Sequence, residues 1–214
     1  MKCKAQMKKT NIKKIEKFHN EVSRLRPDFI VFTDGAVRKK EGIGGASVFV
    51  ADCRVCAENP IVIDIGYFIK NNCTSQRAEL TAFSIGLVVM SKLLKISSNT
   101  ILFSDSKYCV EGCTKWVNSW SEKNIIFSKK NPEFWDFINK FTKLRFSGVN
   151  ILRNIRHCYG HTDTSDDWGI VGNYIADAIA TQTVEGKKTY FNCPISILPD
   201  TNSLEIFFEK INNK

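Results

Sequence analysis

The stretch FIVFTDG, residues 29–35, decides the fold. Its apolar residues end at Asp34, as a buried strand does where it leads into a turn. The stretch ILFSD, residues 101–105, has the same arrangement and ends in Asp105. Because α/β sheets place functional sites where strand ends meet helix starts, these two carboxylates are the first candidates for a site.

The rest of the chain predicts one α/β domain. Two β-rich runs, 46–51 and 61–69, follow the first strand, and apolar residues at helical spacing over 75–94 predict a long helix. The later elements expected are a helix at 106–120, a helix capped by Asn131, a strand at 149–155, a polar loop at 160–172 and a helix at 173–183. This order predicts a mixed five-stranded sheet flanked by helices.

The net charge of +9 is concentrated near the N-terminus. Residues 1–26 carry nine Lys or Arg and two Glu, a balance of +7, which leaves +2 for the remainder. Such a segment suits a polyanionic partner but identifies none. Apolar spacing over Asn11–Leu25 predicts an amphipathic helix that ends before Pro27 and either packs on the domain or serves as a basic arm.

Several classes of protein are excluded. No apolar stretch is long enough to span a bilayer, so we expect no membrane partner. The N-terminal segment lacks the apolar core of a secretory signal, and its Lys and Glu content fits a mitochondrial transit peptide poorly. The eight cysteines lack the spacing of a disulfide scaffold or zinc finger. They predict reduced thiols and a reducing intracellular compartment, the cytoplasm or nucleus.

Four carboxylates occupy positions that structure alone does not explain. Asp34 and Asp105 each end a buried strand. Glu79 lies among apolar neighbours in the first turns of a helix, and Asp177 lies between two alanines. A buried carboxylate is costly unless it is paired or bound to a metal. Oxygen-only ligands favour Mg²⁺ or Mn²⁺ over zinc, so the four residues predict a site for such a cation.

The motifs around these carboxylates carry a family resemblance. Four segments, TDGA (33–36), SQRAEL (75–80), SDSKY (104–108) and GNYIAD (172–177), resemble in sequence order the four acidic motifs of type 1 ribonucleases H. The segment Tyr108–Trp120 resembles the helix of cellular members that leads into their basic protrusion. Any one tetrapeptide would be weak, but four in order are specific.

The resemblance implies a free-standing, monomeric hydrolase that cuts the RNA strand of an RNA·DNA hybrid and leaves 5′-phosphate and 3′-hydroxyl ends. By motif match, Asp34 would bridge two Mg²⁺ ions, for which Mn²⁺ could substitute. Glu79 and Asp105 would complete one ion site, and Asp177 would complete the other. Two such ions can activate a water and stabilise the leaving oxygen.

The resemblance also divides the chain into three regions. A basic N-terminal extension (1–27) would precede a ribonuclease H catalytic domain (28–185), and a C-terminal extension (186–214) would follow it. Two alternatives remain at this stage: another nuclease of the same fold, such as a junction resolvase, and a hybrid-binding module without catalysis. The second alternative would be expected to lack at least one of the four carboxylates.

One histidine is expected to assist catalysis. Gly160-His161 resembles the family's Gly-His motif, and a side chain that titrates near neutral pH suits proton transfer or product release. Eleven residues separate His161 from Asn173, more than the family pattern has. The alternative is that His157 is the true counterpart.

Substrate contacts are expected from polar, aromatic and basic residues. Those expected to touch the hybrid's minor groove or a DNA phosphate are Ser75, Gln76, Asn173, Thr74 and Asn131. Trp116 and Trp120, one helical turn apart, would form a flat wall for deoxyribose. The basic handle on the DNA backbone would consist of Lys123, Lys129 and Lys130, whose phosphate contacts would make binding sensitive to salt.

Overall fold

The computed structural model describes residues 20, 22–54, 61–144, 148, 150–158 and 168–193. The strands are β1 (Phe29–Arg38), β2 (Ile43–Asp52), β3 (Ile63–Ile69), β4 (Thr100–Ser104), β5 (Ile155–His157) and β6 (Tyr190–Asn192). The helices are α2 (Ser75–Leu93), α3 (Lys107–Glu111), α4 (Val117–Glu122), α5 (Pro132–Thr142) and α6 (Trp168–Gly186). A π-helical segment (Gly112–Trp116) joins α3 to α4, and short 3₁₀ segments cover Ile126–Ser128 and Ile151–Asn154.

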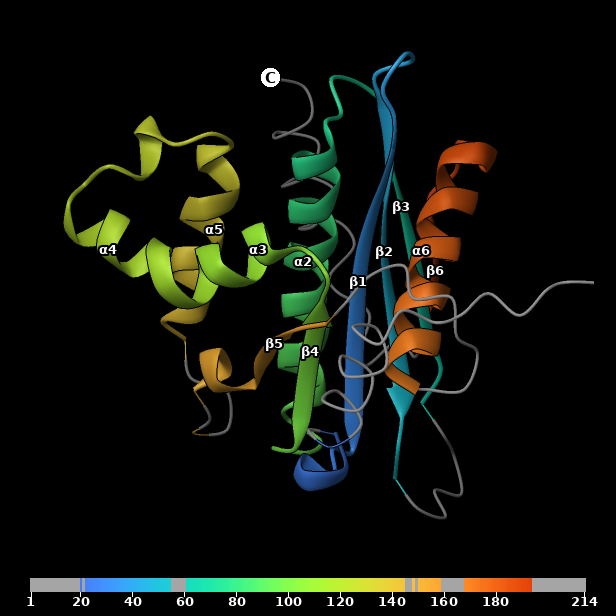
Figure 1. Cartoon of the computed structure of the whole chain (residues 1–214), viewed down its shortest axis with the longest axis vertical. Helices are drawn as coiled ribbons and strands as arrows, with labels where there is room; N and C mark the ends of the chain where they lie inside the picture. The colour runs from blue at the N-terminus through green and yellow to red at the C-terminus, as the bar shows by residue number, and fades with distance from the viewer. Residues whose placement is uncertain are drawn as a thin grey trace, which may run out of the picture.

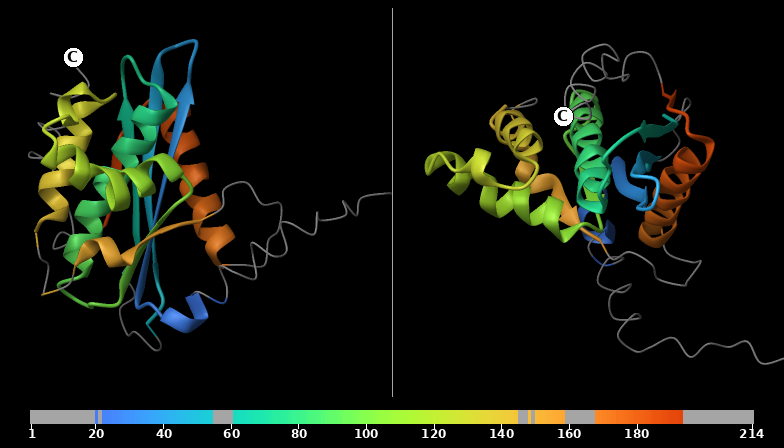
Figure 2. Two further views of the ribbon diagram at one scale, coloured as in Figure 1. Left: turned by 60° about the vertical axis from the view of Figure 1, so that its left-hand side comes forward. Right: turned by 90° about the horizontal axis from the view of Figure 1, so that it is seen from above.

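These elements form one mixed sheet between two helical layers. The strand order is β5-β4-β1-β2-β3-β6, with β4 and β5 parallel to β1 and the other pairs antiparallel. On one face lies α2, with α3, α4 and α5 beyond it, and on the other lies α6 (Figures 1 and 2). The α/β fold expected from the sequence is confirmed, and the sheet has a sixth strand beyond the five expected.

The central strand β1 is buried because both of its faces are covered. Phe29 and Val31 pack into the core on the α2 side, whereas Ile30 and Phe32 pack with Ala176 of α6. This alternation follows from the two-residue period of a strand, which sends successive side chains to opposite faces. The continuous apolar run at residues 29–32 therefore belongs to the sheet, which is the middle layer of a three-layer domain.

The prediction of a strand at 149–155 is wrong over most of its length. Residues 151–154 form a 3₁₀ turn, and β5 begins only at Ile155. Two asparagine side chains favour the turn over strand pairing: Asn150 accepts a hydrogen bond from the Leu152 N–H, and Asn154 donates one to the Thr100 carbonyl at 2.9 Å. Local side-chain bonds of this kind compete with a strand ladder.

The predicted loop at 160–172 is also wrong at its end, since α6 already begins at Trp168. Gly172 belongs to this helix, and a Cβ atom there would lie 2.2 Å from the Phe32 ring. The glycine therefore permits close packing of α6 on β1, which a sequence pattern does not distinguish from a loop glycine.

The described end of the predicted N-terminal helix packs on the domain. Residues 22–25 are helical, and the Val22 and Leu25 side chains contact the core on the α6 side. Apart from Asn20, the rest of the predicted helix over residues 11–21 lies outside the described residues. No helix in the described part of the chain is long and apolar enough to cross a membrane.

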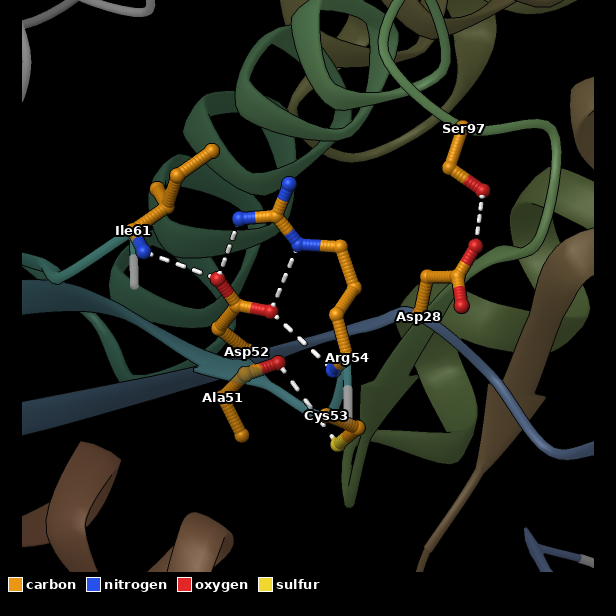
Figure 3. A network of polar contacts seen from close by, with 7 residues as sticks. All are labelled: Asp28, Ala51, Asp52, Cys53, Arg54, Ile61 and Ser97. Atoms are coloured by element: carbon orange, nitrogen blue, oxygen red, sulfur yellow. Dashed lines mark hydrogen bonds and ion pairs between the residues drawn. The ribbon is translucent and has the colours of Figure 1, made fainter. Parts of the chain in front are cut away.

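A polar network links the end of β2 to the start of β3 (Figure 3). The Arg54 guanidinium donates two hydrogen bonds to the Asp52 carboxylate, and the Ile61 N–H donates a third. The Asp52 side chain is only 4% exposed, so its charge is balanced inside the protein rather than by water.

Candidate active site

Strand pairing places two carboxylates side by side. The parallel register of β1 and β4 ends with Thr33 opposite Ser104. Asp34 is the next residue within β1, and Asp105 is the first residue after β4, so the two side chains start from neighbouring positions and reach the same space. The expectation that the two apolar runs lead to neighbouring carboxylates is consistent with this geometry. The prediction that the first strand ends at Asp34 is wrong, because β1 continues to Arg38 through its pairing with β2.

A glycine brings the third carboxylate to this edge. A Cβ atom on Gly35 would lie 2.5 Å from the backbone of Ala78 and of Glu79, so only glycine lets the first turns of α2 approach β1 this closely. Potential ligand atoms of Asp34, Glu79 and Asp105 then all lie within 4.8 Å of one another. Among the described residues, this is the one cluster with the spacing of a metal site.

The cluster brings three carboxyl groups together at a largely enclosed place. Burial raises the pKa of Asp34 to about 8, with further contributions from the charges of Asp105 and Asp177, although the Gly35 N–H opposes them. Burial also raises the pKa of Glu79 to about 9, and the charges of Asp34 and Asp105 add to this effect. Without a cation, the folded protein favours protonated carboxyls here.

This cluster fits a divalent cation. All of its donors are carboxylate oxygens, the set that Mg²⁺ and Mn²⁺ prefer. The Oε2 atom of Glu79 is buried and accepts no hydrogen bond from any described residue. A buried acceptor without a partner is costly, and a cation bound at the cluster would remove that cost.

Asp177 lies beside the cluster rather than within it. It projects from α6, on the opposite face of the sheet from α2, and does not share the 4.8 Å spacing of the other three. Its charge nevertheless contributes to the raised pKa of Asp34. The structure therefore brings all four predicted carboxylates into one region. Asp34, Glu79 and Asp105 have ligand atoms within 4.8 Å of one another, and Asp177 lies near enough for its charge to act on Asp34.

Of the two candidate histidines, His157 lies among the described residues and His161 does not. His157 lies on β5 with Nε2 3.1 Å from the Asp105 carbonyl oxygen, and burial lowers its pKa. This contact ties the ring to the backbone of the acidic cluster. His161 lies outside the described residues.

A cluster of four aromatic rings holds the predicted tryptophan wall. The Trp116 and Trp120 ring centroids are 5.8 Å apart and tilted by 37°. Trp135 of α5 packs edge-on against Trp120 at 5.4 Å and against Tyr108 at 5.2 Å. Its Nε1 donates to the Tyr108 hydroxyl and to the Lys130 carbonyl. The wall is thus braced by α5.

Sequence reasoning missed Trp135. In the structure this tryptophan packs against Gly112, where a Cβ atom would lie 2.1 Å from the indole ring. Gly112 begins the π-helical segment that ends at Trp116. A π turn inserts an extra residue per turn and often marks a functional site. Neither the π turn nor the contact with Trp135 can be read from helical periodicity.

The three lysines of the predicted handle are not equivalent. Lys123 and Lys130 are exposed. The Lys129 ammonium lies 5.3 Å from the centroid of the Trp120 ring, a cation–π contact that joins the handle to the wall. A charged side chain held in this way has a defined position beside the aromatic wall.

The predicted phosphate contacts lie where two helices begin. Thr74 caps α2, its hydroxyl accepting from the Arg77 N–H, and Asn131 precedes α5 with φ of 56°. The prediction that the Asn131 side chain caps α5 is wrong, since it makes no capping bond in this left-handed conformation. An ion pair of 3.7 Å between Arg77 and Glu133 joins the two helix starts.

The predicted minor-groove residues differ in exposure. Ser75 is exposed, whereas Gln76 is half-buried, with an Oε1 atom that is buried and unpaired among the described residues. Asn173 is buried, and its Oδ1 lies 3.5 Å from the Cys158 thiol, which donates to it. Ser75 is thus accessible and Gln76 carries a buried acceptor without a described partner, while Asn173 is engaged inside the protein.

Comparisons with known proteins agree with this geometry. The sequence profile of the RNase H family matches residues 26–185. A protein named Ribonuclease H from Shewanella woodyi is 35% identical over 163 residues, which cover 74% of this chain and 87% of that protein. The Ribonuclease H of Orientia tsutsugamushi is 30% identical over 155 residues, covering 71% and 79%.

Solved structures show the same fold. The solution structure of the PFV RNase H domain superposes with a TM-score of 0.57 and 23% identity, over 75% of this chain and 96% of that domain. The crystal structure of LC9-RNase H1 gives a TM-score of 0.53 at 18% identity, over 79% of each chain. At these identities the likeness concerns the fold alone.

Proposed function

The chain belongs to the RNase H family of hydrolases, and from that premise we propose that it cuts the RNA strand of RNA·DNA hybrids with two divalent cations, leaving 5′-phosphate and 3′-hydroxyl ends. The observation that carries the proposal is the cluster of the buried Asp34 with the half-buried Glu79 and Asp105, whose ligand atoms lie within 4.8 Å. Burial and mutual repulsion make it costly to ionise the carboxyls of this cluster, and a bound cation would remove that cost.

We assign the cation ligands by residue. Asp34 is proposed to face both cations, with Glu79 and Asp105 completing one site and Asp177 the other. Mg²⁺ is the proposed metal, with Mn²⁺ as a substitute. When bound, the two cations would supply charge stabilisation to the phosphate and activate the attacking water. The protein's part is to hold four carboxylates on β1, β4, α2 and α6 at fixed positions.

His161 is proposed to assist proton transfer or product release. The choice over His157 is supported by the contact of the His157 ring with the Asp105 carbonyl, because a tethered ring on a strand is poorly suited to move with a product. The proposed role of His157 is to hold the Asp105 backbone instead.

The hybrid is proposed to lie across α2 and the aromatic wall. Ser75, Gln76 and Asn173 are proposed for the minor groove, and Thr74 with Asn131 for a DNA phosphate. The wall of Trp116 and Trp120 presents an apolar face that suits a sugar without a 2′-hydroxyl. Lys123, Lys129 and Lys130 would hold the DNA backbone, so affinity is expected to fall as salt rises.

The organisation of the chain is also a proposal. We propose a monomer with a catalytic domain at 28–185, a basic extension before it and a C-terminal extension after it. Part of the latter, β6, pairs with β3. The six described cysteines are free thiols, which supports a reducing compartment. They are Cys53, Cys73, Cys109, Cys113, Cys158 and Cys193.

One gel tests the proposal. The full chain is incubated with a labelled RNA·DNA hybrid, single-stranded RNA, duplex RNA and a four-way junction, each with Mg²⁺ or with EDTA. The expected result is Mg²⁺-dependent cleavage of the hybrid's RNA strand alone, with product 3′ ends that a polymerase can extend. Cutting of the junction would instead indicate a resolvase, and hybrid binding without any cleavage would indicate a binding module.

A further inference from the structure

Ser47 of β2 joins the backbones of two proposed metal ligands. Its hydroxyl is fully buried and lies 2.6 Å from the Ala176 carbonyl oxygen and 3.2 Å from the Asp34 carbonyl oxygen, so one proton is shared between the two acceptors. Ala176 immediately precedes Asp177 on α6. We propose that Ser47 is a positioning residue that fixes α6, and with it Asp177, against Asp34, an inference that rests on the two-cation site proposed above.

The surface on which α6 lies explains why such a bond is needed. The strands beneath it carry glycines at the contact: a Cβ atom on Gly45 would lie 2.4 Å from the Ala180 carbonyl, and one on Gly66 would lie 2.2 Å from the Thr183 hydroxyl. Small residues allow close approach but give little directional contact, so they do not resist sliding or rotation of the helix. The Ser47 hydrogen bond is directional and therefore defines the position of α6 on the sheet.

Strand register places this bond at the site. Ser47 is the antiparallel partner of Asp34, so the hydroxyl acts at the same level of the sheet as the carboxylate. Asp177 lies outside the 4.8 Å cluster formed by the other three carboxylates. Its distance from Asp34 thus depends on how α6 is seated. Mg²⁺ tolerates little variation in ligand distance, and groups that orient metal ligands commonly change metal affinity 10- to 100-fold when removed.

The chain offers a matched control in Ser84. This residue of α2 is also fully buried, and its hydroxyl has no hydrogen-bond partner among the described residues. Ser84→Ala removes a buried hydroxyl of the same size without releasing a helix. A loss of metal binding in Ser47→Ala but not in Ser84→Ala therefore reports the hydrogen bond rather than the loss of a polar atom from the core.

The experiment measures Mn²⁺ binding to the full chain from the electron paramagnetic resonance signal of free Mn²⁺. Two classes of site are expected in the wild type, the tighter at the three-carboxylate cluster. Ser47→Ala is expected to weaken the weaker class about tenfold and to leave the tighter class within about twofold. In an Asp177→Asn background, Ser47→Ala is expected to have no further effect, because both changes act on the same class.

A second readout is the Mg²⁺ concentration for half-maximal hybrid cleavage, expected to rise about tenfold in Ser47→Ala while KM for the hybrid stays within about twofold. If Ser47→Ala does not fold, the nearly isosteric Ser47→Cys is measured in its place, since a thiol is a weaker donor. Equal weakening of both Mn²⁺ classes, or no change in either, overturns the inference. Unchanged Mn²⁺ binding in both Asp34→Asn and Asp177→Asn overturns the two-cation site itself.

Discussion

Asp34 and Asp52 lie on adjacent strands and are both almost fully enclosed, yet their surroundings have opposite effects. Asp52, which pairs in register with Phe29, receives hydrogen bonds from Arg54 and from the Ile61 N–H, and these hold its pKa at about 2 (Figure 3). Asp34 lies further along β1, where burial and two other carboxylates raise its pKa to about 8.

The difference separates a carboxylate that stabilises the fold from one that costs stability. At neutral pH Asp52 is ionised and its charge is balanced within the protein, whereas burial and the neighbouring carboxylates keep Asp34 largely protonated when no cation is bound. Ionisation of Asp34 therefore requires a positive partner that compensates its charge. For a set of carboxylate oxygens, a divalent cation is such a partner. Neutralising a carboxylate of the cluster around Asp34 and neutralising Asp52 should therefore have opposite consequences for activity and stability.

The largest effect is expected on catalysis. Asp105→Asn should reduce cleavage of the hybrid at saturating Mg²⁺ about 1000-fold or more, because metal-assisted charge stabilisation contributes several kcal/mol to the barrier. Asp52→Asn is the control and should retain activity within about twofold well below its unfolding temperature. Single-turnover cleavage of a labelled hybrid measures both. Full activity of Asp105→Asn would falsify the assignment of the acidic cluster.

The second effect concerns stability against pH in EDTA. The folded protein keeps protons on Asp34 and Glu79 up to about pH 8 and 9, whereas the unfolded chain loses them near pH 4. Since the folded state binds more protons between these limits, the free energy of unfolding should fall by several kcal/mol as pH rises from 5 to 9.

Two controls isolate this effect. Glu79→Gln should flatten the pH dependence and be more stable than the wild type at pH 8, since it removes one of the opposed charges. Mg²⁺ should stabilise the wild type at pH 8 but not Glu79→Gln to the same extent. Urea unfolding followed by circular dichroism gives each free energy. A wild-type protein whose stability in EDTA is the same as that of Glu79→Gln at every pH would show that the carboxylates are not in conflict.

The third effect is a loss of stability, whereas neutralising Glu79 is expected to stabilise the protein. Asp52→Asn should lower the free energy of unfolding at pH 7 by about 1–2 kcal/mol, a value reduced for the partial exposure of Arg54. Because the folded pKa of about 2 lies below the unfolded value, this stabilisation is complete above about pH 4 and is lost as pH falls toward 2. Urea unfolding at pH 7 and pH 2.5 measures it; an equal deficit at both pH values would exclude the ion pair as its cause.

The sequence predicts the acidic cluster better than the structure that surrounds it. Asp34 and Asp105 are recognisable because each interrupts an apolar strand pattern that is local and strong. The short strand β6 is not, since three residues carry no periodicity and their pairing with β3 depends on the rest of the sheet. Nor can sequence separate Asp34 from Asp52, because each follows an apolar run in the sequence and only tertiary neighbours decide the sign of the pKa shift.

The aromatic wall shows the same division. Trp116 and Trp120 are four residues apart and follow from helical spacing, but their support by Trp135 depends on a contact between distant helices through Gly112. Ser47 is a further case, since a serine within a strand gives no sign that it will bond a helix carbonyl 129 residues away. Local patterns thus predict which residues carry the chemistry, and long-range packing determines which residues hold them in place.

The smallest effect is expected from a change at Arg54, which tests whether Asp52 needs the hydrogen-bond geometry of the guanidinium or only its positive charge. Arg54→Lys keeps the positive charge but loses the two-pronged hydrogen bond and the stacking of the guanidinium 4.7 Å from the Phe29 ring centroid. The free energy of unfolding should fall by less than it does for Asp52→Asn, because a lysine still pairs with the carboxylate. Urea unfolding at pH 7 in EDTA gives the value, and Mg²⁺-dependent cleavage should be unchanged. A loss as large as that of Asp52→Asn would mean that the planar fork, rather than the net charge, balances the buried carboxylate.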